Sequence, residues 1–231
     1  MVGAFAMSKD KNNIIQQLKH YTIMENKEIN NNGFEYVDLG LTSGTLWATM
    51  NVGANKPSDG GLYFQWGDTK GYTKGQVGKG KGKKEFSSNW SDYKFGERTK
   101  FGERTNFSKY STKGAALDLE DDAANANVGG DWHIPSPKQI RELIDETTNE
   151  LTMQDDISGY LFTSKKDSSK TLFIPAAGIV LDGSLEFADS YVVFWTSMLN
   201  MEYITCAQVY VFARLDYAGR CCGIPVRGVI G

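Results

Sequence analysis

The sequence has little of what metal sites and disulfide frameworks need. Its 231 residues include three cysteines, Cys206, Cys221 and Cys222, and two histidines, His20 and His133. An odd number of cysteines does not make a disulfide framework, and a structural zinc site usually takes four Cys or His ligands. We therefore expect neither a cysteine-stapled fold nor a bound metal or other cofactor.

The sequence also lacks long apolar runs and a strong net charge. No stretch approaches the roughly 20 apolar residues of a membrane span. The apolar part of the N-terminal MVGAFAMSKDKN is too short for a secretory signal. The formal net charge of −3 gives no bulk attraction to nucleic acid or to an anionic membrane. These features predict a protein without membrane insertion and without a nucleic-acid partner.

Glycine and aromatic residues are abundant instead. The chain holds 25 Gly, 12 Phe, 11 Tyr and 5 Trp, a balance that favours a loop-rich domain of short strands over a helix bundle. We predict an N-terminal appendage at residues 1–33 and one domain at residues 34–231, with a loop insertion at about residues 70–106. The insertion contains the lysine-rich KGYTKGQVGKGKGKK and two tandem copies of KFGERT, and we expect it to be solvated.

Local patterns predict several elements of the domain. FEYVDLGL, TLWATMNVG and most segments after Gly159 read as strands. In IPSPKQIRELIDETT, Ser136 suits the N-cap and Pro137 the first helical position, which predicts a helix. The acidic run LDLEDD lacks the spacing of an EF-hand calcium loop, and it precedes the alanine-rich AANANV. It therefore predicts the charge-favoured start of a second helix.

Six sequence blocks carry a family resemblance. In order, they are EYVDLGLTSGTLWATMNVGA, GLYFQWGDT, LDLEDDAANANVGGDWHIPSPKQIRELI, FIPAAG, FWTS and GIPVRGVI. Together they resemble the Fibrobacter succinogenes major paralogous domain family, which is similar to the C-type lectin fold of the formylglycine-generating-enzyme type. The resemblance covers about residues 34–231. It implies an α+β fold of short antiparallel sheets with a few flanking helices, in which the two ends of the domain lie close together.

The resemblance also implies a function. Some relatives are variable proteins of diversity-generating retroelements, in which a reverse transcriptase changes codons near the C-terminus before a fixed last strand. Such proteins bind ligands and do not catalyse. For this chain the resemblance implies a non-enzymatic receptor-recognition protein on a phage particle or a bacterial cell surface. Its partner would be a protein or another cell-surface ligand, and its oligomeric state is open.

The expected variable surface lies in the C-terminal strands and the loops around them. Codons that end in a pyrimidine cannot encode Glu, Gln, Lys, Met or Trp, and Gln208 alone belongs to that set between residues 203 and 224. The displayed residues are expected to be Tyr191, Val193, Tyr203, Thr205, Cys206, Val209, Val211, Ala213, Leu215, Tyr217, Ala218, Cys221, Cys222 and Ile224. This set is unusually apolar, which favours a protein or aromatic-rich ligand over a bare sugar.

Other interpretations stay open at this point. Val209, Val211 and Leu215 could be ordinary core residues, and the chain could be an adhesion domain without programmed variation. Cys206 with Cys221 or Cys222 could imitate the cysteine pair of a formylglycine-generating oxidase. Calcium-dependent sugar binding is disfavoured, because the sequence lacks the Glu-Pro-Asn and Gln-Pro-Asp motifs of typical C-type lectins.

Overall fold

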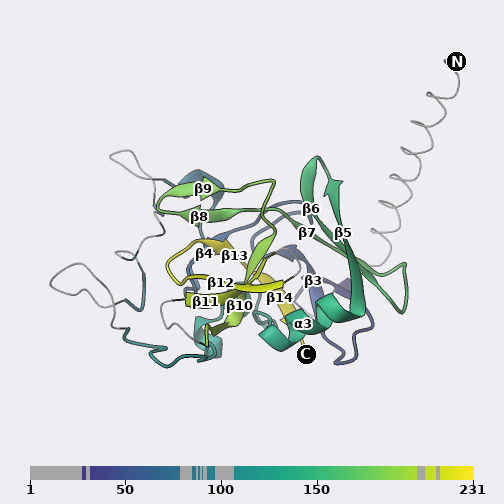
Figure 1. Ribbon diagram of the computed structural model, residues 1–231, viewed down its shortest axis with the longest axis horizontal. Coiled ribbons are helices and arrows are strands. Elements are labelled where there is room, and N and C mark those ends of the chain that lie inside the picture. The colour runs from purple at the N-terminus through teal and green to yellow at the C-terminus, as the bar shows by residue number, and fades with distance from the viewer. Residues whose placement is uncertain are drawn as a thin grey trace, which may run out of the picture.

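The fold is a mixed α+β architecture of small antiparallel sheets with a few short helices (Figure 1). The computed structural model describes residues 28–29, 32–78, 85–86, 88, 90, 93–96, 107–201, 206–211 and 214–231, and the backbone alone for residues 28–29 and 206–211. Every pairing between the named strands is antiparallel. The α+β prediction is confirmed at this level.

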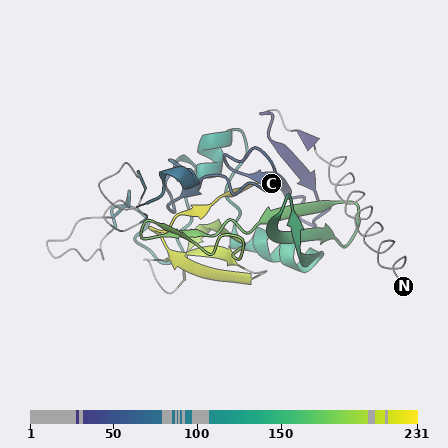
Figure 2. The same cartoon turned by 90° about the horizontal axis from the view of Figure 1, so that it is seen from above.

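A four-stranded sheet joins the two ends of the predicted domain. Its order is β1 (Glu28–Ile29), β2 (Glu35–Asp38), β3 (Leu46–Asn51) and β14 (Arg227–Ile230). β2 and β14 both pair with β3, so the beginning and the end of the domain lie side by side, as Figure 2 shows. β1 belongs to the segment predicted as an appendage, and it extends this sheet by one strand.

The C-terminal strands form a second sheet, which carries the predicted surface. Its order is β10 (Val193–Leu199), β11 (Cys206–Val211) and β12 (Arg214–Gly219). After β12 the chain turns into β13 (Ile224–Pro225), which pairs with β4 (Tyr63–Phe64). β12 is an edge strand of its sheet in the described part of the chain.

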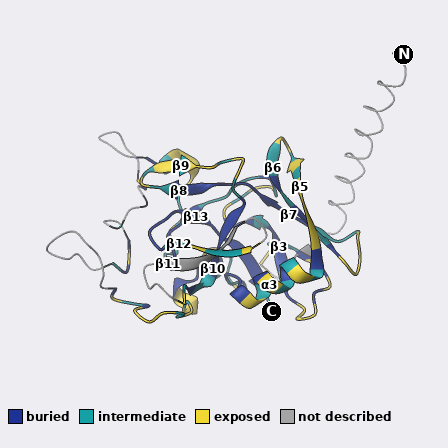
Figure 3. Cartoon of the chain, viewed as in Figure 1, coloured by how far each residue is buried: buried dark blue, intermediate teal, exposed yellow. Residues whose placement is uncertain are grey.

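Two hairpin units complete the strands. β5 (Thr147–Gln154), β6 (Ile157–Ser164) and β7 (Thr171–Pro175) form a three-stranded sheet, and β8 (Ile179–Leu181) pairs with β9 (Ser184–Glu186). The strand at β5 was not predicted. Its outer position leaves most of its side chains exposed (Figure 3), so its sequence carries no apolar alternation.

The helices begin where the sequence predicts. α3 (Pro137–Glu146) starts with a capping box, in which the Ser136 hydroxyl accepts from the Gln139 N–H and the Gln139 side chain accepts from the Ser136 N–H. α2 (Ala123–Val128) starts at Asp122, whose carboxylate accepts from two helical N–H groups. Two short 3-10 turns add η1 (Lys74–Gln76) and η2 (Leu119–Asp121).

β10 separates two hydrophobic cores. Trp195 packs into the core that contains Phe64 and Trp66, whereas its neighbour Phe194 packs into the core that contains Trp47 and Phe162. Successive side chains of a strand point to opposite faces, so one strand serves both cores. Two tryptophans tie β10 to β4: the Trp195 indole donates to Phe64 O at 2.8 Å, and the Trp66 indole donates to Thr196 O at 2.9 Å.

Part of the predicted loop insertion lies in the core, whereas from the sequence we expected the whole insertion to be solvated. Phe86, Tyr93 and Phe95 are buried, and Phe86 stacks on Tyr72 with ring centroids 4.4 Å apart. Phe95 belongs to the first KFGERT copy. The second copy and much of the lysine-rich stretch lie outside the described residues.

Candidate functional site

An open pocket lies where β8, the chain leading into β10, and the edge strand β12 meet. Its volume is about 160 Å³, and it is lined by Ile179, Tyr191, Val193, Arg214, Asp216, Tyr217 and Ala218. Four of these residues belong to the predicted surface, namely Tyr191, Val193, Tyr217 and Ala218. The fold therefore brings part of the predicted surface together around one concave feature.

Strand register explains how β10 and β12 reach the same pocket. Val193 of β10 is paired with Val211 of β11, and Val211 is paired with Arg214 of β12. Directly opposite residues of an antiparallel pair share one face of the sheet. Val193 and Arg214 therefore lie on one face, and Asp216 follows Arg214 on that face two residues along β12.

An ion pair gives the pocket a polar side. The Arg214 guanidinium lies 3.0 Å from the Asp216 carboxylate, and Arg214 is largely exposed. An ion pair this exposed contributes little to folding stability. Its position at the pocket instead offers a ligand both a donor fork and a carboxylate acceptor.

Tyr191 gives the pocket an apolar side, and its stacking partner Phe187 sits on strained backbone. Tyr191 lines the pocket and stacks on Phe187 with ring centroids 4.7 Å apart. Phe187 has φ = 58° although it is bulky, and its side chain is 52% exposed. Such a conformation costs on the order of 1–3 kcal/mol and tends to occur at functional sites.

The size of the pocket restricts what it can hold. Sites for drug-sized molecules usually measure roughly 300–1,000 Å³. The pocket here, at about 160 Å³, matches one large side chain or a fragment of similar bulk. Its mixture of aromatic walls and an ion pair suits an amphipathic side chain of a protein ligand.

The chain matches no family model, no curated protein and no solved structure. The family resemblance therefore stays a prediction carried by its six sequence blocks. No helix among the described residues is long and apolar enough to cross a membrane.

Three predicted surface residues are not displayed, which corrects the sequence interpretation. Cys221 and Cys222 are each 8% exposed and Ile224 is fully buried, all three in the core around Phe64. Ile224 pairs with Phe64 in the β4–β13 sheet, and the Gln65 side chain donates to Cys221 O at 3.0 Å. These contacts draw the turn after β12 inward. The two cysteines are therefore core residues rather than displayed positions.

Besides Tyr191, Tyr217 and Ala218 at the pocket, the other predicted residues are either buried or only partly described. Val193 is also buried, at 3% exposed, although it lines the pocket, and Leu215 is half-buried against the core that contains Phe194. Leu215 thus follows the alternative interpretation as a core-facing residue. Tyr203, Thr205 and Ala213 lie outside the described residues, and for Cys206, Val209 and Val211 the backbone alone is described, within β11.

Arg220 anchors the end of the surface sheet. Its guanidinium is fully buried and donates to the Tyr93 hydroxyl at 2.7 Å and to Tyr110 O at 3.1 Å. The same group lies over the rings of Phe107 and Trp66, at 4.2 and 5.2 Å from their centroids. Burial lowers the pKa of Arg220 below its usual value. Arg220 therefore fixes the end of β12 to the segments that contain Tyr93 and Tyr110.

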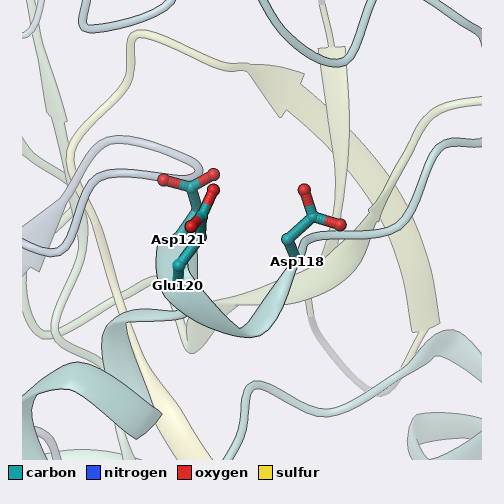
Figure 4. A group of neighbouring side chains, drawn as sticks. All are labelled: Asp118, Glu120 and Asp121. Carbon is teal, nitrogen blue, oxygen red and sulfur yellow. The ribbon is translucent and has the colours of Figure 1, made fainter.

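A cluster of three carboxylates lies away from the pocket. Ligand atoms of Asp118, Glu120 and Asp121 come within 4.8 Å of one another (Figure 4). The Lys109 ammonium lies 2.7 Å from both the Asp118 and Glu120 carboxylates and also contacts Asp121. Hydrogen bonds to Asp118, then Asp121 and Glu120, raise the pKa of Lys109. The lysine supplies the positive charge here, and we assign no cation site to this cluster.

Three lining residues escaped the sequence interpretation. Ile179 comes from β8, far from the C-terminal strands in sequence, and no local pattern connects it to them. Arg214 and Asp216 alternate with Leu215 along β12, and that alternation is the signal that could have found them.

Proposed function

We propose that the protein is a non-enzymatic ligand-recognition protein that seats one side chain of a protein or cell-surface ligand in the pocket beside β12. The observation that carries the proposal is the convergence of predicted surface residues from separate segments on one open pocket, where Tyr191, Val193, Tyr217 and Ala218 meet. Energy in protein interfaces concentrates in a few anchor side chains that fill such pockets.

The surroundings of the pocket support this role. Tyr217 is 54% exposed and Phe187 is 52% exposed, so aromatic surface is available next to the cavity. Tyrosine is favoured at recognition surfaces because it offers large contact area at low entropic cost. The net charge of −3 again argues against nucleic acid as the ligand.

The family resemblance adds that a retroelement diversifies this surface. On the proposal, changes fall on exposed positions of β12, such as Arg214 and Tyr217, and on β11. The buried framework residues Arg220, Ile224 and Val226 stay fixed, because a change there would cost folding stability.

The test is deep sequencing of this gene across a natural population. We expect substitutions to concentrate in the codons of β11 and β12, beside a near-copy with adenines at those codons and a reverse-transcriptase gene. The codons of the exposed turn at residues 165–170 are the matched control, because drift alone would change both regions. Equal substitution in turn and strands, with no near-copy, would overturn programmed diversification.

An adhesion domain without programmed variation is the second candidate. The burial of Cys221, Cys222 and Ile224 favours it, because fixed core residues then occupy positions that the resemblance assigns to variation. The same sequencing experiment separates the two candidates. In the second case the pocket residues, including Tyr191 and Tyr217, would be as constant as the core.

A further inference from the structure

The strand β5 offers a long edge that no other strand covers among the described residues. All eight of its residues pair with β6, from Thr147 opposite Ser164 to Gln154 opposite Ile157, without a bulge. The other side of such a strand presents backbone N–H and C=O groups that can accept a further strand. Proteins usually protect an edge of this kind with lysine, proline or a bulge. The sequence of β5, TTNELTMQ, contains neither lysine nor proline.

Both ends of β5 are held in place. At its beginning, the Thr147 hydroxyl donates to Leu143 O in α3. At its end, the Asp155 carboxylate in the turn to β6 accepts from the Ser58 hydroxyl at 2.7 Å and lies 3.3 Å from the Lys56 ammonium. A segment that is already ordered loses little further freedom when it binds. The edge of β5 is therefore preformed.

A row of apolar side chains leads from the core onto this edge. Ile174 of β7 lies opposite Tyr160 of β6, and Tyr160 lies opposite Leu151 of β5, so all three share one face of the sheet. Ile174 is buried and Tyr160 is half-buried against the same core, whereas Leu151 is 68% exposed. Met153 follows on that face two residues along and is 59% exposed. The apolar face of the sheet thus continues beyond the core to the edge strand.

We propose that this edge is an interface between two copies of the chain, in which β5 pairs with β5 of a second copy about a twofold axis at Leu151. Two antiparallel copies of one strand are related by such an axis perpendicular to the sheet, so their core faces lie on the same side. The two three-stranded sheets then form one six-stranded sheet. The apolar rows of the two copies meet end to end at Leu151, and an arbitrary extended peptide would bring no such matching row.

The charge and length of β5 favour this register. Glu150 is the one charged residue of the strand, and an axis at Leu151 sets Glu150 opposite Thr152. An axis at Glu150 would instead set two carboxylates directly opposite each other, which is destabilising. An axis at Thr152 would run into the turn at residues 155–156, whose backbone has positive φ. Of these central registers, the one at Leu151 uses most of the strand and separates the two carboxylates.

This interface is separate from the proposed ligand pocket, because no residue that lines the pocket belongs to β5. A dimer would carry two pockets, and two linked sites hold a ligand surface with repeated epitopes more strongly than one site does. A contact made mainly by one strand belongs to the weak end of protein interfaces. We therefore expect dimerisation to depend on protein concentration.

Sedimentation equilibrium of the reduced full-length chain measures the dimer. We expect the unmodified chain to shift from monomer to dimer as its concentration rises. Leu151→Lys should raise the dimer dissociation constant at least about tenfold, because it removes the central apolar pair and sets two like charges opposite each other. Leu119→Lys is the matched control, since Leu119 is a 61% exposed leucine in η2, and it should leave the dimer unchanged. Thermal melting verifies that both variants are folded.

Oxidative cross-linking tests the register. Leu151→Cys places two thiols directly opposite each other across the axis, within reach of a disulfide. Glu150→Cys is the control, because its two thiols would be diagonal neighbours with backbones about 7–8 Å apart, which is too far for a relaxed disulfide. The unmodified chain gives the background from the three native cysteines. We expect a covalent dimer in Leu151→Cys well above the amount in the other two proteins.

Several results would overturn the interface. The unmodified chain could stay monomeric at every concentration that can be prepared, and the edge would then belong to a different partner. A dimer that persists in Leu151→Lys, or one that Leu119→Lys weakens equally, would place the contact elsewhere in the chain. Equal cross-linking of Leu151→Cys and Glu150→Cys would overturn the twofold axis at Leu151.

Discussion

At the scale of single residues, buried polar side chains fix the geometry behind the candidate surface. Arg220 and Arg227 are both fully buried. Arg227 donates to Ala48 O and Phe173 O, and so links β3 with β7 below β14. Arg220 links the end of β12 to the Tyr93 hydroxyl and to Tyr110 O. Each arginine satisfies carbonyl groups from segments that are distant in sequence.

Replacing Arg220 by lysine tests this role. Lysine keeps the charge but loses the planar fork, so Tyr93 and two backbone carbonyls lose donors in a buried site. We expect Arg220→Lys to lower the free energy of unfolding by about 2–4 kcal/mol, measured by urea denaturation. The exposed Arg214→Lys is the control and should stay within about 0.5 kcal/mol. Equal losses in both variants would contradict the framework role.

Tyr63 makes stability fall at alkaline pH. Burial, and secondarily the Asp189 carboxylate, raises the pKa of Tyr63 from 10.0 to about 12. Between these values the unfolded phenol loses its proton while the folded one keeps it, so stability decreases as the pH rises. By pH 12 the loss from this group reaches about 2–3 kcal/mol.

Urea denaturation across the alkaline range measures this effect. Tyr63→Phe should lose less stability between neutral and alkaline pH than the unmodified chain. Its free energy of unfolding at neutral pH should be lower, because it lacks the hydrogen bond to Ala177 O. Burial lowers the pKa of Arg227 to about 9, and this shift makes stability rise with pH. Because Arg227 is present in both Tyr63→Phe and the unmodified chain, its contribution is the same in the two proteins. Tyr217→Phe removes an exposed hydroxyl and should keep the original slope. A Tyr63→Phe slope that matches the unmodified chain would refute the assignment.

At the scale of elements, the start of α3 is set by local chemistry. Ser136→Ala removes the hydroxyl half of the capping box and should lower the free energy of unfolding by about 1 kcal/mol. Thermal or urea unfolding measures the change. Ser184→Ala, at an exposed position of β9, is the control and should be close to neutral. An undiminished stability in Ser136→Ala would mean that packing alone sets this end of the helix.

Elements with local signals could be predicted, and those set by distant contacts could not. The Ser136–Pro137 pair marks the start of α3 in the sequence itself. β5 gives no such signal, because an edge strand with one partner needs no apolar alternation. The structure ends α3 at Glu146, and β5 begins at the next residue, Thr147.

The candidate site was predictable in part, for a related reason. Tyr191, Tyr217 and Ala218 were found through the family resemblance and the strand pattern. The pocket itself depends on how β8 meets β12 across the fold, which no local pattern records. The paired cysteines were misplaced because a turn next to a strand reads as exposed, while its burial comes from Gln65 and Phe64.

At the scale of the whole molecule, β10 joins two cores into one cooperative unit. Phe194 and Trp195, adjacent in sequence, belong to different cores. The four-stranded sheet then connects the opening of the domain to β14. A change that destabilises one core should therefore destabilise the other, and the domain should unfold in one transition.

Truncation tests this cooperativity. Removing residues 227–231 deletes β14 with Val229 and Arg227, both fully buried, and strips β3 of one partner. We expect the truncated chain to lose its near-ultraviolet circular dichroism and its sharp urea transition. Removing Gly231 alone leaves β14 in place and should preserve both signals. A cooperative transition in the longer truncation would show that the two cores are independent.

The pairing of β3 with β14 also has a kinetic consequence. Trp47 lies opposite Val229, so this contact closes a loop that spans most of the domain. The entropy of closing such a loop must be overcome before its contacts give any stabilisation, and folds dominated by distant pairings usually take milliseconds to seconds to form. Joining the two neighbouring ends covalently and opening the chain at an exposed turn, such as residues 165–170, would turn this distant pairing into a local one. The rearranged protein should then refold faster while its native contacts stay the same.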